Sequence, residues 1–396
     1  MKTLTLEPLP PERLGPLLRW SCDLHRSGDG EAPSRQRLWF ESAADQGATL
    51  ADDDAEPYLI ATLMLAMQEG RTLVVGGRVS RLLLANLEEY QAFWHATAPR
   101  AYRRVQVIVA PGCIDDAPAL VDPAGEAIAA FSGGLDASFL AWRHHARLAG
   151  ERSRRIRFFV MLEGFDIRTR DAAHAAPAIA AARETLADLG GELRVLRTNF
   201  RDVVPVIWNH AHGSALVACM HFFKAHAGTV LVASCEKYDD LVIPWGMSPI
   251  SDPLLSSAAL RVLHDGAECS RSEKARALEA WPAGKDRLRV CWGTENPGGN
   301  CMRCEKCLRT MANFAAQGLA VPRSLGGSET ALNRGIVRIK LRTLAQESEW
   351  RSIAALGRGR PRRFWQRWIP VLLAFARLRR AYYVTIGRPD RAGMNS

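Results

Sequence analysis

Glu126-Ala-Ile-Ala-Ala-Phe-Ser132-Gly-Gly-Leu-Asp136-Ala-Ser138-Phe-Leu-Ala-Trp142 carries the clearest structural pattern in this chain. It begins with apolar and small residues, turns at Ser-Gly-Gly, and continues with apolar residues at helical spacing. That order predicts a buried strand, a tight glycine loop and the start of a helix. Glycines let the backbone approach a ligand, and the N–H groups of a first helical turn point at it with the positive end of the helix dipole. The loop therefore suits a pyrophosphate, with Ser132 as an added donor, and an ordinary Gly-Gly turn is the plainer alternative.

The presence of Asp136 in a phosphate-binding loop requires a separate explanation. Asp136 would repel a phosphate unless it acts through Mg²⁺ or accepts a proton or a hydroxyl group. Ser132-Gly-Gly-Leu-Asp136 resembles the PP-loop of the N-type ATP pyrophosphatases, which include asparagine, GMP and NAD synthetases, tRNA-thiolating enzymes and 7-cyano-7-deazaguanine synthase. Ala137 stands where that family usually has serine or threonine, which leaves one of its pyrophosphate contacts open. The resemblance implies an ATP site at Ser132, Gly133, Gly134, Leu135, Asp136 and Ser138.

Composition limits the class of protein. A chain of 396 residues is expected to hold two or three domains, and 47% hydrophobic residues suffice for ordinary cores. No apolar run approaches the ~20 residues of a spanning helix, and the N-terminus lacks the apolar core of a signal peptide. A cytoplasmic location is expected, where nine cysteines are not a disulfide framework.

The positive charge is concentrated at the C-terminal end. Residues 331–396 hold 15 arginines and lysines against three acids, a net charge of +12. The first 330 residues therefore carry −2 of the chain's total of +10. The predicted catalytic region is not basic.

Two α/β units are expected before this tail. Residues 1–30 are polar, contain prolines and are weakly patterned. The segment after them predicts a small unit with strands at 37–40, 72–75 and 105–109 and helices at 57–67 and after Ser80. From residue 126, strands at 156–162, 193–196 and 229–233 alternate with helices at 172–189 and 212–225. This alternation predicts a doubly wound parallel sheet with ligands at the carboxyl ends of its strands.

Further candidate residues follow these strands. The resemblance places the adenine of ATP at the end of the second strand, at Met161, Leu162 and residues 163–166. Asp239 and Asp240 follow the fourth strand, where they either hold Mg²⁺ or the substrate or serve a turn. Cys235 is interpreted as a packing residue.

Cys291, Cys301, Cys304 and Cys307 form the second strong motif. Two residues between cysteines let both sulfurs turn onto one ion, and Cys291 is expected to come from a strand at 288–291. Four thiolates close a tetrahedral shell, which predicts a structural zinc ion, with an iron–sulfur cluster as the alternative.

The pairing of the loop with this motif resembles 7-cyano-7-deazaguanine synthase over roughly residues 125–315. That family binds structural zinc and uses ATP to convert a carboxylate to an amide and then a nitrile. The resemblance places Arg271 at the position of a phosphate-binding cation, with Lys274 one helical turn later. A solvated helix face is the alternative for Lys274.

The expected architecture is a small N-terminal α/β domain (1–120), a PP-loop domain of the HUP type with a zinc knuckle (121–325) and a basic helical tail (326–396). The expected activity is ATP-dependent adenylation of a carboxylate or amide oxygen for a nitrogen nucleophile, with Asp136, Ser132 and Arg271 as catalytic residues and ATP, Mg²⁺ and Zn²⁺ as cofactors. A tRNA-modifying enzyme and a catalytically silent nucleotide-binding or assembly subunit are the alternatives. A small or macromolecular substrate and a second copy of the chain are the expected partners.

Two interpretations of the C-terminal tail follow from its sequence. Residues 362–380 predict a basic amphipathic helix, interrupted at Pro370, with Trp365, Trp368 and Phe375 among its arginines. Such a helix binds nucleic acid or an anionic membrane. Alternatively, its apolar residues dock on the protein's own core, namely Ile369, Val371, Leu372, Leu373 and Phe375.

Overall fold

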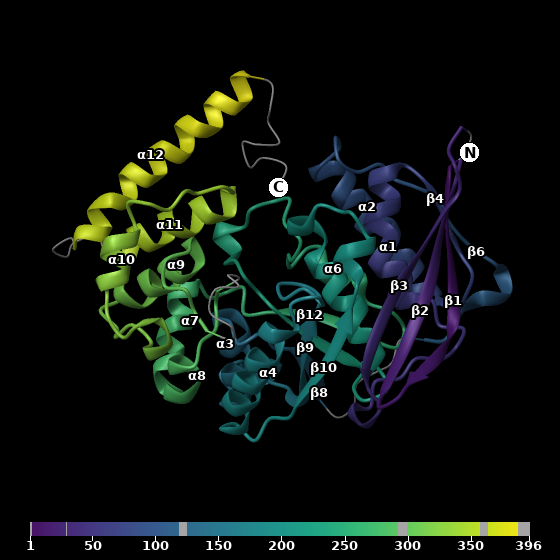
Figure 1. Ribbon diagram of the computed structural model, residues 1–396, viewed down its shortest axis with the longest axis horizontal. Coiled ribbons are helices and arrows are strands. Elements are labelled where there is room, and N and C mark those ends of the chain that lie inside the picture. Colours follow the sequence, from purple (N-terminus) through teal and green to yellow (C-terminus); the bar gives the residue numbers. More distant parts are fainter. Residues whose placement is uncertain (1, 29, 119–124, 292–298, 357–362, 387–396) are drawn as a thin grey trace.

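The computed structural model describes residues 2–28, 30–118, 125–291, 299–356 and 363–386. Its centre is a ten-stranded sheet in the order β12-β11-β8-β9-β10-β3-β2-β1-β4-β6 (Figure 1). The first five strands of this order are parallel, as predicted from the alternating pattern. Their bounds are β8 (Glu126–Ala130), β9 (Arg155–Glu163), β10 (Leu193–Thr198), β11 (Thr229–Ala233) and β12 (Arg261–Asp265).

The chain reverses its direction across the sheet between β8 and β11. From β8 it adds β9 and β10 on one side, and it then returns to place β11 and β12 on the other. The loops after β8 and β11 therefore flank the switch point, where open parallel sheets bind ligands. Strand β12 was not predicted, because this edge strand of five residues has only two apolar residues, Val262 and Leu263, between charged or polar ones.

The same sheet continues into the N-terminal unit. Strand β10 pairs antiparallel with β3 through Arg197 opposite Glu41 and Thr198 opposite Phe40. The strands of this unit are β1 (Thr3–Leu14), β2 (Leu17–Ser27), β3 (Ser34–Ala43), β4 (Thr72–Val75) and β6 (Val107–Val109), with a separate small pair of β5 (Val79–Ser80) and β7 (Ile114–Asp115). The predicted domain boundary at 120/121 falls in residues 119–124, outside the described parts of the chain.

Residues 1–30, which were predicted to be only weakly patterned, form regular structure. Strands β1 and β2 form a long antiparallel hairpin. Only Leu4 and Leu6 of β1 are buried, and the prolines of its exposed half accompany a register shift between Leu9 and Glu12. Proline is tolerated at such irregular, exposed positions, so the composition hid the strand.

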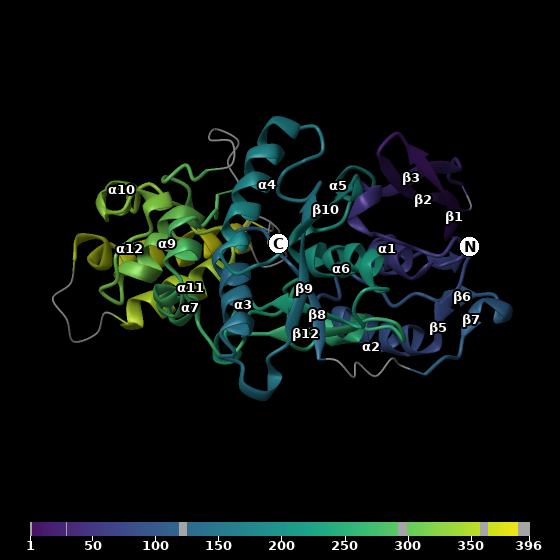
Figure 2. The same cartoon turned by 90° about the horizontal axis from the view of Figure 1, so that it is seen from below.

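Helices cover both faces of the sheet. Figure 2 shows α3 and α4 on one side of the central strands and α1 and α6 on the other. The helices up to this point are α1 (Glu56–Glu69), α2 (Arg81–Thr97), α3 (Leu135–His145), α4 (Ala172–Ala187), α5 (Phe200–Val203) and α6 (Trp208–Met220). The helix predicted at 212–225 is α6, which begins earlier, at Trp208. It also ends earlier, at Met220, because residues 221–223 form a 3₁₀ turn.

The remaining helices pack beyond α3 and α4. They are α7 (Arg271–Ala277), α8 (Pro282–Asp286), α9 (Glu305–Ala315), α10 (Thr330–Gly335), α11 (Leu344–Leu356) and α12 (Phe364–Thr385). The predicted interruption at Pro370 is wrong, because Ile369 and Leu372 are buried on either side of the proline and hold one continuous helix. Arg362, the predicted first residue, lies outside the described residues. No helix in the described ranges has the length and apolar character needed to cross a membrane.

Residues 288–290 do not form the strand that was predicted. The N–H of Arg289 donates to the carbonyl of Gly133 at 2.8 Å, and the N–H of Val290 donates to the Asn300 side chain at 2.9 Å. Since these donors bond to the glycine loop and to the cysteine segment, the stretch fastens two sites together instead of joining a sheet.

Candidate functional site

The glycine loop has the predicted strand–loop–helix form. The N–H of Phe131 continues the ladder to Val160 at 2.9 Å, and α3 begins directly after Gly134, its N-terminal cap residue. Gly133 has a φ of 76°, a left-handed conformation that favours glycine, and an added Cβ would lie 3.5 Å from Arg289. Ser132 is exposed at the turn, and its Oγ accepts from the N–H of Gly134 at 3.3 Å.

Ser138 and Ala137 lie on the buried side of α3. Both side chains are buried, and the Ser138 hydroxyl has no hydrogen-bond partner among the described residues. Ser138 therefore keeps an unused hydroxyl one residue after the position where the family carries one.

Asp136 joins the loop to α7. Its carboxylate receives Nε of Arg271 at 3.1 Å and Nζ of Lys274 at 3.1 Å. Lys274 is almost fully buried and also donates to the carbonyl of Ser234 at the end of β11. Burial opposes ionisation of Asp136, but the charges of Arg271 and Lys274 outweigh it and hold the pKa of the carboxyl below its usual value. The solvated-face interpretation of Lys274 is therefore wrong.

Two further cations, which the sequence did not reveal, lie at this site. Arg289 packs against Gly133, and its Nε is buried without a hydrogen-bond partner in the described parts of the chain. Burial lowers the pKa of Arg289. Burial also lowers the pKa of Lys306, with the charge of Arg271 adding to the effect. The only sequence signal for both was their position beside the cysteines, which the fold packs behind the loop.

Glu236 is a third residue that the sequence did not reveal. It follows β11 at the switch point and is 6% exposed. One of its oxygens accepts from the N–H of Val242 at 2.9 Å, while Oε1 is buried with no partner among the residues the structure describes. Burial raises the pKa of this carboxyl to about 7. A buried acid with an unpaired oxygen is typical of a functional site.

Its neighbour Cys235 behaves as a packing residue. The Sγ accepts from Nε1 of Trp245 at 3.2 Å, and burial raises the pKa of the thiol to about 12. The thiol is therefore protonated at neutral pH and is a poor nucleophile.

The predicted acidic ligands of Mg²⁺ do not converge. Asp239 is exposed and pairs with Lys237 at 3.3 Å, Asp240 accepts from Ser348 at 3.5 Å, and Asp136 is paired as described above. Outside the masked segments, three or more potential metal-binding side chains meet only at the four cysteines and at a group on the β1–β2 hairpin. The described residues thus build no protein cage for Mg²⁺, an ion that commonly keeps its waters and binds through phosphates.

The expected adenine position lies at the end of β9. Met161 is buried in the core cluster that includes Phe131 and Leu135, and Leu162 is half-buried against the opposite cluster. Gly164 follows with a φ of 105°, and a Cβ there would lie 1.9 Å from the carbonyl of Thr198. This glycine lets the 163–166 turn pass close to the end of β10.

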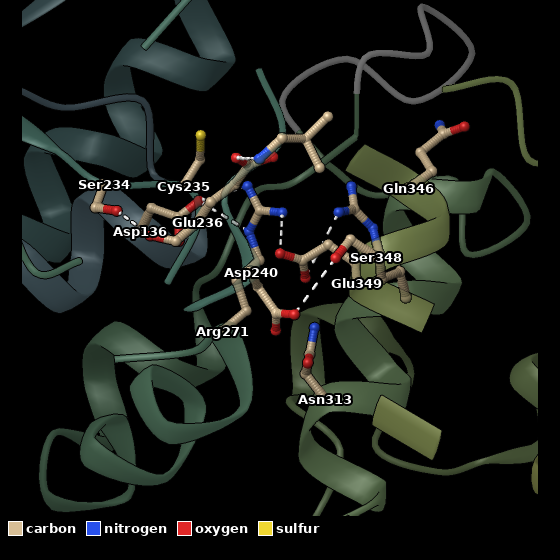
Figure 3. A network of polar contacts seen from close by, with 12 residues as sticks. Asp136, Ser234, Cys235, Glu236, Asp240, Arg271, Asn313, Gln346, Ser348 and Glu349 are labelled. Carbon is tan, nitrogen blue, oxygen red and sulfur yellow. Dashed lines mark hydrogen bonds and ion pairs between the residues drawn. The ribbon is translucent and has the colours of Figure 1, made fainter. Parts of the chain in front are cut away.

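A helix of the tail reaches the same network. Glu349 of α11 is 12% exposed and lies 3.0 Å from Nη1 of Arg271. Figure 3 shows the Arg271 guanidinium between the carboxylates of Asp136 and Glu349, with Ser348 bonded to Asp240. Asp136 and Glu349 raise the pKa of Arg271 against the opposing effect of burial. In the sequence, Glu349 looks like an ordinary helix-surface charge.

The four cysteines meet at one point, as predicted. Their sulfurs lie within 4.8 Å of one another, with Cys291 and Cys304 at 3.8 Å and Cys301 and Cys307 at 4.0 Å. A hydrogen bond from Cys307 lowers the pKa of Cys304 to about 5. Four sulfurs of this kind fit a structural metal ion such as zinc.

Asn300 organises the cluster. Its Oδ1 accepts from the N–H groups of Val290 and Cys291, and its Nδ2 donates to the carbonyls of Leu288 and Ser324. Being 3% exposed, the side chain ties the first cysteine to the segment that carries the other three.

Searches of protein-family models, curated proteins and solved structures find no match for this chain. The likeness to PP-loop enzymes therefore remains a prediction from the residues of the loop and the cysteine motif.

Proposed function

We propose that this protein is an ATP-dependent adenylating enzyme, which forms AMP and pyrophosphate to activate a carboxylate or amide oxygen for a nitrogen nucleophile. One observation carries the proposal: a glycine loop at the switch point of a parallel sheet has three cations beside it, Arg271 and Lys274 on Asp136 and Arg289 against Gly133. This concentration of positive charge around loop N–H groups suits a triphosphate.

The proposed reaction does not depend on a nucleophilic side chain of the protein. The substrate oxygen attacks the α-phosphorus of ATP, the bond to the β-phosphate oxygen breaks, and pyrophosphate leaves. The nitrogen nucleophile then displaces AMP from the activated group and loses a proton. The loop N–H groups and the cations position the phosphates and neutralise charge on the leaving pyrophosphate.

Asp136 acts on this site through its partners. It fixes the side chains of Arg271 and Lys274, and Lys274 is in turn tied to the end of β11. Asp136 is therefore a positioning residue, and its paired carboxylate does not present two free oxygens to a metal.

The test is AMP and pyrophosphate release from ATP with pools of carboxylate metabolites and ammonia. We expect Lys274→Gln and Asp136→Asn to lower AMP formation at least about tenfold. Lys285→Gln is the matched control, since Lys285 pairs with Glu279 and not with a loop residue. Full activity in both site variants would reject the proposal.

A catalytically silent nucleotide-binding subunit is the second candidate. It is favoured by Ala137 and by Arg271, which already contacts two carboxylates. Binding of ATP without AMP release under every substrate pool would support this candidate.

A further inference from the structure

Helix α12 carries two apolar stripes, and only one of them is used by the fold. Trp365, Ile369, Leu372 and Ala376 are buried, and of these the docking interpretation of the tail predicted Ile369 and Leu372. Phe375, which that interpretation also counted as docked, is 64% exposed, so the interpretation is correct only in part.

The second stripe faces solvent. Its residues follow one another at three-, four- and seven-residue spacing, so they share one face of the helix. Leu378 is 67% exposed, Tyr382 61% and Phe364 55%, and Val371 is half-buried between them. We call Phe364, Val371, Phe375, Leu378 and Tyr382 the outer stripe.

The position of the helix makes this stripe accessible. Figure 1 shows α12 at the outer edge of the molecule, and Arg380 ties its C-terminal half to Glu347 of α11. The fold therefore presents the outer stripe on the outward side of an edge helix.

The charge around the stripe has one sign. Between Phe364 and Thr385 the helix holds four arginines and no acidic residue. Arg367 and Arg377 are exposed, and Arg380 pairs with Glu347 of α11. A surface complementary to this helix has an outer anionic layer, which meets the arginines, and an apolar layer beneath it, which receives the outer stripe.

We propose that α12 lies on an anionic lipid surface, with the outer stripe in the acyl boundary and the arginines at the headgroups. A basic amphipathic helix of this kind inserts in the plane of the interface, and no described helix is able to cross the bilayer. Val371 and Leu378 argue against RNA, because aliphatic side chains do not stack on bases as aromatic ones do. This proposal is independent of the nucleotide chemistry.

The test is co-sedimentation of the full chain with vesicles of phosphatidylcholine alone or mixed with phosphatidylserine. We expect binding to the mixed vesicles only, weakened by added salt through screening. The double variant Phe375→Glu and Leu378→Glu is expected to bind at least about tenfold more weakly.

The matched control is Leu148→Glu with Ile250→Glu, which places the same charges at exposed apolar positions elsewhere. Unchanged circular dichroism and thermal melting of both double variants verify that the fold persists. Equal vesicle binding by the two double variants would overturn the proposal. So would capture of single-stranded RNA without vesicle binding, or a dimer in sedimentation that the α12 variant dissociates.

Discussion

At the scale of single residues, the guanidinium of Arg271 lies between two acids that belong to different parts of the chain. Asp136 belongs to the glycine loop, and Glu349 belongs to the tail helix α11. A phosphate bound to Arg271 would meet the charge of Glu349, which no loop residue neutralises.

Removing that charge should strengthen nucleotide binding. We expect Glu349→Gln to raise the affinity for ATP roughly tenfold, because a negative charge beside the cations proposed to bind the phosphates is lost. Titration calorimetry of the full chain measures the change, with Glu184→Gln as the control, since Glu184 pairs with Arg287 at the surface. Weaker ATP binding by Glu349→Gln would instead show that Glu349 positions Arg271 for the ligand.

Glu236 should make stability depend on pH. Its pKa rises from an ordinary value of 4.5 to about 7 in the folded protein. The folded state therefore holds the proton more tightly, so this carboxyl contributes stability that is full below about pH 4.5 and is lost as pH rises through about 7. The shift corresponds to about 3 kcal/mol. We expect urea unfolding between about pH 5 and pH 8 to show a smaller loss of stability in Glu236→Gln than in the parent protein.

The sequence predicts part of this site. Ser132, Gly133 and Gly134 were predicted because the strand–loop–helix pattern is local in the sequence, and Arg271 with Lys274 because the resemblance to PP-loop enzymes placed cations there. Residues such as Arg289 and Glu349 were not found, since packing over more than 130 residues brings them to the loop.

At the scale of elements, the cysteine knuckle and the start of α9 form one unit. Cys304 caps α9, and its sulfur accepts from the N–H of Cys307 at 3.5 Å. The spacing rule predicted the sulfur cluster correctly, because Cys301, Cys304 and Cys307 follow one another with two residues between them. It did not predict Asn300, three of whose four bonds go to residues 288–291 and the fourth to Ser324.

We expect elemental analysis to find about one zinc per chain. Cys304→Ser should lower the melting temperature by several degrees, because metal binding is coupled to folding. Cys269→Ser is the control, since Cys269 lies outside the cluster. Iron in the protein together with a visible absorption band would contradict the zinc prediction and indicate an iron–sulfur cluster.

The parallel strands and the main helices follow from hydrophobic periodicity, which reports burial on one or two faces. Strands β1 and β12 escaped it for a physical reason. The first is half exposed and rich in proline, and the second is an edge strand with charged ends.

At the scale of the whole molecule, the tail belongs to the fold. Trp350, Ile353 and Trp365 are buried in the same apolar cluster as α9. We expect a chain ending at Thr330 to aggregate or to melt at least several degrees earlier, because its apolar partners face water. Light scattering and thermal melting check this outcome, and a soluble truncated chain with an unchanged melting temperature would contradict it.

The pairing of β3 with β10 also has a consequence for synthesis. When β3 leaves the ribosome, its partner in the sheet is about 150 residues from being made, so the strand's outer edge stays open and able to capture another nascent chain. Glu41 lies on this edge, and in the finished protein it is 1% exposed and held by Arg19 and Arg197. Before Arg197 is made, Glu41 has Arg19 of the preceding strand as its partner, and a charged residue on an open strand opposes pairing with another chain. Once β10 is made, the same carboxylate joins the two halves of the sheet through Arg197.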